Sequence, residues 1–305
     1  MPVLDKTIVR VSIVATAATV GVVSLVAAAI SLRLTLKHRK LHAAAAAMDK
    51  ETAEAARKGK NSTVHLLIVP RWRFAPSVSP PCTKLETFLR LAKIPYEAHV
   101  VSSTKVSPTG CLPCIIHNGK RMAESNVIID YITAQFRVKL DKHLTEEQRA
   151  LGTAVGSMLE YGDRFAYYRT ITGEGAKLLI PHVARALRVP QLIARIIVYR
   201  MRARLTRSAQ LAGIDTSTEE SEQEYLQDIK TIEHIIGEKS FLLGDEPTSY
   251  DCAVYAAFLP IVHMDVAEKV SKPFAYIKHS KVLTSYVDRM TEATFPDLTK
   301  LLEGQ

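Results

Sequence analysis

Val64-His-Leu-Leu-Ile-Val69 is a short and nearly continuous apolar run. A run of this length is typical of a buried β-strand. Prolines then mark a loop over 76–81, because proline fixes the backbone and cannot donate a hydrogen bond. Apolar residues recur at helical spacing over 82–93, which predicts a helix with one buried face. A second strand is expected over 96–101.

The next segment predicts a hairpin and one more helix. Asn118-Gly119 lies between short apolar runs at 114–117 and 120–122, and Asn-Gly in such a position is a strong signal for a two-residue turn. Ser125 is a suitable N-cap for a helix that runs to Phe136. The order strand, helix, strand, long connection, hairpin, helix resembles a thioredoxin-like half-domain.

From Thr145 onward, helical periodicity dominates and strand signals disappear. Thr145-Glu-Glu-Gln148 fits the capping-box pattern at a helix start. The fold class expected is therefore an α/β thioredoxin-like N-terminal domain followed by an all-α C-terminal domain. Helices of the second domain are expected over 146–171, 176–207, 219–237, 249–267 and 274–303.

The N-terminal segment predicts one transmembrane helix. Residues 11–32 contain no charged side chain, and a helix of that length is about 33 Å long, enough to cross a bilayer core. The heavier basic flank follows this run, at Arg33 and 37–40, which predicts a single-pass protein that faces the cytosol, in the mitochondrial outer membrane or the endoplasmic reticulum. A cleaved signal peptide is the alternative, although the apolar run exceeds the usual length.

These features divide the chain into four parts. An anchor with its basic flank is expected over 1–40, a solvated stalk over 41–63, the thioredoxin-like domain over 64–140 and the all-helical domain over 141–305.

The composition argues against nucleic-acid and metal binding. The net charge of +9 has no accompanying nucleic-acid motif, so we interpret it as charge that faces a membrane surface. Four cysteines are too few for a disulfide framework, which favours a reducing compartment. Cys111 and Cys114 form a C-x-x-C by count, but no partner pair or His lies at zinc spacing, so no metal is expected.

Three stretches carry a family likeness. They are Ser79-Pro-Pro-Cys-Thr-Lys-Leu-Glu-Thr-Phe-Leu-Arg90, then Gly110-Cys-Leu-Pro113 with the segment 118–132, and Leu243-Gly-Asp-Glu-Pro-Thr-Ser-Tyr-Asp251. In this order and spacing the chain resembles a glutathione-transferase-fold protein of the failed-axon-connections and metaxin-related branch. Metaxin-like proteins carry their membrane segment elsewhere, so the N-terminal anchor departs from that group.

The resemblance implies a residue that holds the sulfur of glutathione at the first helix N-terminus. Ser79 occupies that position, and Cys82 follows three residues later. A helix N-terminus stabilises a thiolate by its dipole and free N–H groups. The alternative is structural, with Ser79 starting the helix and Cys82 packing in the core. Because the order is S-x-x-C, a dithiol–disulfide cycle lacks its first thiol.

The resemblance also implies a binding site for the peptide part of glutathione. Pro113 matches the cis-proline of the fold, which would present the backbone of Leu112 to the ligand. Glu124 and Ser125 match the pair that holds the γ-glutamyl group, since a helix N-terminus suits a carboxylate. An ordinary N-cap and a structural proline are the alternatives.

Two further segments have mainly structural interpretations. Thr248 and Asp251 resemble the capping box of the second domain, and we interpret them as structural. The basic segment 177–207 has no acidic residue, so it either lies on an anionic membrane or packs in the helical domain with solvated arginines. The segment 161–168 is expected to form core, or the wall that receives a hydrophobic co-substrate.

Two functions follow from the resemblance. The first is a membrane-anchored adaptor that binds a protein partner and retains a degenerate or weak glutathione site. The alternative is a glutathione transferase that conjugates glutathione to a hydrophobic electrophile. Membrane contact is expected through residues 11–32, with 177–207 as a second candidate. A homodimer remains open, because no sequence feature decides it.

Overall fold

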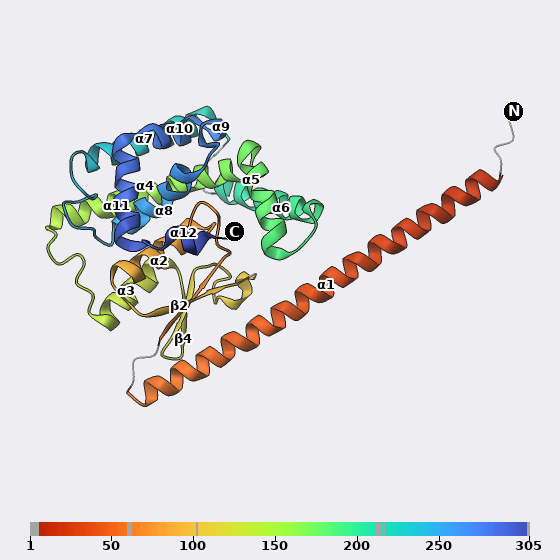
Figure 1. Ribbon diagram of the computed structural model, residues 1–305, viewed down its shortest axis with the longest axis horizontal. Coiled ribbons are helices and arrows are strands. Elements are labelled where there is room, and N and C mark those ends of the chain that lie inside the picture. Colours follow the sequence, from red (N-terminus) through yellow and green to blue (C-terminus); the bar gives the residue numbers. More distant parts are fainter. Residues whose placement is uncertain (1–5, 60–62, 102, 212–214, 216, 304–305) are drawn as a thin grey trace. The chain divides into compact units, whose positions relative to one another are not determined.

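A computed structural model describes residues 6–59, 63–101, 103–211, 215 and 217–303, with the side chains at 6–27, 30, 34, 161 and 163 outside the description. The chain divides into two compact units, Met1–Ala47 and Met48–Gln305. The second unit contains the predicted sheet and the predicted helical part, and in Figure 1 its green-to-blue helices lie above the sheet.

The sheet has the predicted thioredoxin-like order. Its four strands run β2-β1-β3-β4, with β1 parallel to β2 and antiparallel to β3, and β3 antiparallel to β4. Alternate residues of β1 pack in one core cluster with residues of α2 and α3, such as Leu85 and Ile128. The elements are β1 (Val64–Ile68), α2 (Pro80–Leu91), β2 (Tyr96–Val100), η1 (Thr104–Val106), β3 (Cys114–His117), β4 (Lys120–Ala123) and α3 (Ser125–Phe136).

The rest of the second unit is helical, and the capping box at Thr145 is present in full. Two predicted helices are divided in the structure: the segment 176–207 forms two helices, and the segment 274–303 forms three. Pro190 separates α5 from α6, because proline lacks the N–H that would continue the helix, and Arg188 ends α5 with φ of 55°. The helices are α4 (Glu146–Thr170), α5 (Gly173–Leu187), α6 (Gln191–Leu211), α7 (Glu219–Ile236), α8 (Asp251–His263), α9 (Ala267–Val270), α10 (Lys272–His279), α11 (Lys281–Thr294) and α12 (Leu298–Leu302).

The predicted transmembrane helix is corrected by the structure. Residues 11–32 lie in α1 (Lys6–Arg57), which does not end at the basic flank but runs on through the predicted stalk. Its described part carries Arg33, Lys37, Arg39 and Lys40 within the helix. Most side chains of 11–32 lie outside the described ones. In the part of the chain that the structure describes, no helix combines the length and the apolar character needed to cross a membrane.

The same finding overturns the predicted localisation. A single-pass protein facing the cytosol, in the mitochondrial outer membrane or the endoplasmic reticulum, requires a spanning helix. None is found among the described residues.

The last two turns of α1 pack on the β3–β4 turn within the second unit. The backbone N–H of Gly119 donates to the Thr52 hydroxyl at 3.0 Å, and Thr52 is buried. Arg121 forms an ion pair with Asp49. Gly119 has φ of 70°, and a Cβ added there would lie 2.7 Å from the Cβ of Ala53. The end of the predicted stalk is therefore part of the folded unit.

Gly119→Ala should lower the free energy of unfolding by about 2 kcal/mol, because alanine disfavours this φ and would also collide with α1. Urea denaturation measures the change. Gly110→Ala is a matched control, since Gly110 has φ of 73° with nothing within 4 Å of an added Cβ. Gly110→Ala should lower the free energy of unfolding only by the cost of the backbone conformation, about 1 kcal/mol. Equal losses in the two variants would argue against the packing of α1 on the hairpin.

A buried ion pair fixes the loop that leads to α2. The Arg71 guanidinium donates to both carboxylate oxygens of Glu86 and to the carbonyl of Pro76. Glu86 is fully buried and also accepts from the Tyr96 hydroxyl at 2.9 Å. Charge-assisted bidentate bonds of this kind are strong and directional. The network therefore holds the start of α2, where Ser79 lies, against the sheet.

Candidate functional site

A cavity of about 690 Å³ lies where the carboxyl end of β1 and the starts of α2 and α3 meet α4 and α6. Its polar side includes Ser79, Glu124 and Ser125, and its apolar side includes Tyr167 and Met201. Ligand pockets of drug-sized molecules span about 300–1,000 Å³. The cavity therefore has room for a tripeptide and an apolar molecule beside it.

Ser79 and Cys82 lie at the start of α2 but differ in exposure. The backbone of Ser79 begins the helix, while its side chain makes no capping hydrogen bond, and Ser79 lines the cavity. Cys82 is fully buried. Burial raises the pKa of the Cys82 thiol to about 11, while hydrogen bonds from Ser79 and Ser77 act in the opposite direction. A thiol in this state is a poor nucleophile near neutral pH.

The loop before β3 brings backbone to the cavity. The Leu112–Pro113 peptide bond is cis, and both residues line the cavity together with Cys111. Cys111 is exposed, whereas Cys114 is buried. Burial raises the pKa of Cys114 to about 11. The two cysteines thus differ in environment.

Glu124 and Ser125 stand at the N-terminus of α3 and face the same cavity. Glu124 has φ of 70° and ψ of 113° and makes no side-chain capping bond. This conformation is unfavourable for any residue except glycine, and such strain occurs most often at functional sites. The first backbone N–H groups of a helix lack partners within the helix and favour an anion. The arrangement suits a carboxylate.

Charged and amide groups of α3 and α4 complete the polar rim, and Lys84 of α2 bonds to one of them. Lys84 donates to the Asn126 side-chain oxygen at 2.6 Å, and Asn126 donates to Glu160 at 3.0 Å. Arg164 also lines the cavity and is exposed. Sequence reasoning missed Glu160, Arg164 and Asn126, because isolated polar residues on helices give no signal until it is known that α3 and α4 line the same cavity.

The apolar wall comes from two segments that the sequence analysis singled out, one as core or as this wall and the other for its basic charge. Tyr167 belongs to the predicted segment 161–168, and Met201 and Leu205 belong to the basic segment 177–207. Burial raises the pKa of Tyr167, so its hydroxyl remains protonated. An apolar molecule held here would lie beside Ser79.

Thr248 and Asp251 lie away from the cavity, at the start of α8. The Asp251 carboxylate accepts from the backbone N–H and the hydroxyl of Thr248 at 2.8 and 2.7 Å. Both residues are fully buried. Of the predicted site residues, the structure therefore brings Ser79, Leu112, Pro113, Glu124 and Ser125 around one cavity, leaves Cys82 in the core, and separates the capping pair.

Comparison with protein families gives two matches. A model described as "Glutathione S-transferase N-terminal domain" matches residues 80–172. A second, described as "Glutathione S-transferase, C-terminal domain", matches residues 225–290. The two matches follow each other in the order of the two structural parts.

Individual relatives are consistent with these matches. Failed axon connections of Drosophila melanogaster is 31% identical over 248 residues, which cover 77% of this chain and 58% of that protein. This chain therefore spans little more than half of that relative's length. Isoprene-epoxide–glutathione S-transferase of Rhodococcus sp. (strain AD45) is 27% identical over 231 residues, covering 73% of this chain and 94% of the enzyme.

A solved structure is similar in fold. Glutathione transferase GSTFuA3 from Phanerochaete chrysosporium superposes with a TM-score of 0.51 at 16% identity, over 77% of this chain and 99% of that protein. At this level of identity the similarity concerns the fold alone.

Proposed function

This chain belongs to the glutathione-transferase-fold family, in the branch related to Failed axon connections, and on that premise we propose that it binds glutathione in the cavity beside Ser79. One observation carries the proposal: Ser79, the backbone before Pro113 and the N-terminus of α3 face the same space of about 690 Å³. The named activity of the Rhodococcus relative supports the choice of ligand.

Each part of glutathione has a chemically suitable partner in this proposal. The N-terminal N–H groups of α3 and the Ser125 hydroxyl hold the γ-glutamyl carboxylate. The Glu124 carboxylate holds the ammonium group by charge. The backbone of Leu112 pairs with the cysteinyl amide, and the Ser79 hydroxyl donates to the sulfur.

When bound, glutathione supplies a thiolate that attacks an electrophilic carbon, with formation of a C–S bond and loss of the leaving group or opening of a ring. The hydroxyl of Ser79 stabilises the sulfur anion by a hydrogen bond at the positive end of α2. Tyr167, Met201 and Leu205 receive the apolar electrophile and exclude water. Cys82 has no part in this proposal, because it is buried and protonated.

The binding site is tested by Glu124→Gly and Glu124→Ala with isothermal titration of reduced glutathione. Both variants should bind at least about tenfold more weakly than the wild type, since each loses a charge-assisted hydrogen bond. The glycine variant should also be about 1 kcal/mol more stable than the alanine variant, because glycine accepts φ of 70° without strain. Unchanged affinity in both variants would remove Glu124 from the site.

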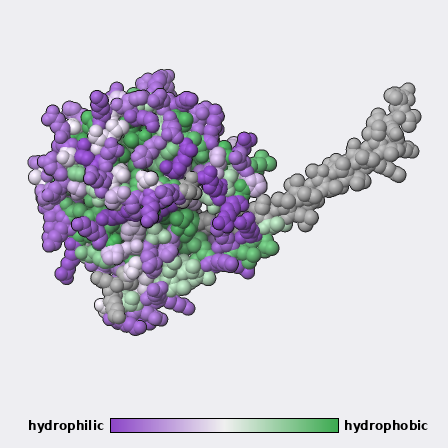
Figure 2. Space-filling view, viewed as in Figure 1, coloured by the Kyte–Doolittle hydropathy of each residue, from purple (hydrophilic) through white to green (hydrophobic). Residues whose placement is uncertain are grey.

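A protein-binding module with weak turnover is the second candidate. The supporting observation is a row of exposed apolar side chains on α6: Leu192, Ile196 and Tyr199, which are 67%, 49% and 69% exposed. Their spacing places them on one face of the helix, and exposed apolar rows of this kind often mark interaction surfaces. The coloured surface seen in Figure 2 is mostly hydrophilic, with smaller hydrophobic areas. A second copy of the chain is one partner that such a row could bind.

A further inference from the structure

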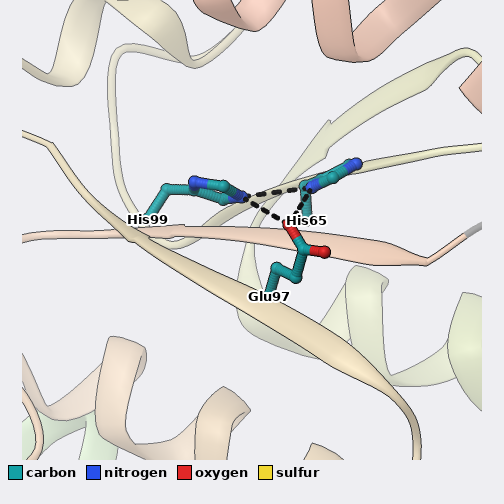
Figure 3. A group of neighbouring side chains, drawn as sticks. All are labelled: His65, Glu97 and His99. Carbon is teal, nitrogen blue, oxygen red and sulfur yellow. Dashed lines mark hydrogen bonds and ion pairs between the residues drawn. The ribbon is translucent and has the colours of Figure 1, made fainter. Parts of the chain in front are cut away.

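Two histidines and a glutamate converge on the edge of the sheet, as Figure 3 shows. His65 lies on β1, and Glu97 and His99 lie on the neighbouring edge strand β2. In the parallel register His65 is opposite Glu97, and Leu67 is opposite His99. Because Glu97 and His99 are two residues apart, their side chains share a face of the strand.

The interatomic distances suit a small divalent cation. His65 Nδ1 and His99 Nε2 are 3.1 Å apart. The Glu97 Oε2 atom lies 3.6 Å from His65 Nδ1 and 3.8 Å from His99 Nε2. In tetrahedral zinc sites, with bonds of about 2.0–2.1 Å, neighbouring ligand atoms are about 3.3–3.4 Å apart. With small side-chain rotations, one ion can therefore lie at a bond length of about 2.0–2.1 Å from all three atoms.

The surroundings leave one side of the group open. The side chain of His65 is 8% exposed, that of His99 is 29% exposed and that of Glu97 is 61% exposed. Two imidazoles and one carboxylate, with a fourth position accessible to water, form a common zinc ligand set. None of these residues lines the glutathione cavity. Val64, Leu66 and Ile68 pack with α2, so by strand alternation His65 faces away from that helix.

We propose that His65 Nδ1, Glu97 Oε2 and His99 Nε2 bind one Zn²⁺ ion, which joins β1 to the edge strand and keeps a fourth coordination position open to solvent. The sequence analysis expects no metal, because no partner pair or His lies at zinc spacing from Cys111 and Cys114. Glu97 and His99 follow His65 by 32 and 34 positions, so the three ligands form no linear motif. Their meeting depends on the register of two parallel strands.

The test uses the purified full chain, treated with a chelator and titrated with Zn²⁺ against a chromophoric competitor. The wild type should bind one Zn²⁺ ion. His99→Ala should bind none, and Glu97→Gln should bind it at least about tenfold more weakly than the wild type. His99 and Glu97 lie on the edge strand and are partly exposed, so both variants should fold; their Tm values without zinc check this. Zn²⁺ should raise the Tm of the wild type but not that of His99→Ala, because the ion binds the folded state.

Other zinc-binding groups are controlled by two further variants. His38 and His42 lie 3.0 Å apart on α1, and Cys111 is an exposed thiol. His42→Ala and Cys111→Ser should each bind one Zn²⁺ ion with the affinity of the wild type, whereas His99→Ala should not. If His99→Ala binds Zn²⁺ as tightly as the wild type, or if the wild type binds none, the proposed site is wrong. In either case the glutathione proposal is unaffected, because it rests on different residues.

Discussion

Replacement of Asp251 by alanine is expected to lower the free energy of unfolding by about 3–4 kcal/mol, since it leaves several buried donors without an acceptor. The carboxylate accepts from Leu242 N at 2.8 Å, from the N–H and hydroxyl of Thr248, and from the Tyr286 hydroxyl at 3.0 Å. Tyr286 is fully buried on α11. Asp251 therefore joins the preceding loop, the start of α8 and a distant helix.

Equilibrium denaturation in urea measures this loss. Asp245→Ala is the matched control, because Asp245 is an exposed carboxylate in the same loop, and its removal should change stability by less than about 0.5 kcal/mol. Asp251→Asn should fall between the two, since an amide keeps one acceptor oxygen but turns an NH₂ group toward donors. Equal stability of the Asp251→Ala and Asp245→Ala variants would contradict the role assigned to Asp251.

Local signals explain which parts of the fold could be predicted. Thr248 and Asp251 stand at the spacing of a capping motif, and Asn118-Gly119 specifies a turn by its own backbone preferences. Helix α3 ends at Phe136 as predicted, but its N-cap is Glu124, and Ser125, the predicted N-cap, is its first helical residue. In each case the residues that specify the turn or helix end are neighbours in the chain, so their pattern can be recognised before any tertiary contact is known.

Tertiary contacts explain what could not be predicted. The packing of Thr52 on Gly119 joins residues 67 positions apart. The sequence alone therefore predicts only a solvated stalk over 41–63. The Arg71–Glu86 pair could not be predicted for the same reason. Nor could the position of Arg164, which depends on α3 and α4 lining the same cavity. The transmembrane prediction is overturned on other grounds. It rested on the lack of charge over 11–32, but within the part of the chain that the structure describes no helix has both the length and the apolar character that a bilayer crossing requires.

Ser79→Ala is the second change with a large expected effect. The full chain should conjugate glutathione to chlorodinitrobenzene, and the variant should lower kcat/KM about 100-fold, equivalent to about 2.7 kcal/mol of transition-state stabilisation. The Kd for glutathione should change by less than about threefold, because the hydroxyl acts on the developing thiolate more than on the bound thiol. Steady-state kinetics and isothermal titration measure the two quantities separately.

Two cysteine variants decide whether the Ser79 hydroxyl or a cysteine thiol is the group required for conjugation. Cys82→Ala should keep kcat/KM within about threefold, because burial holds that thiol protonated with a pKa of about 11. Cys111→Ser changes an exposed group of the same cavity and should also keep turnover. Loss of activity in Cys82→Ala with an active Ser79→Ala would reverse the assignment. A wild type that binds glutathione but conjugates no electrophile would instead favour the binding module, in which the Ser79 hydroxyl at the start of α2 no longer meets a reacting partner.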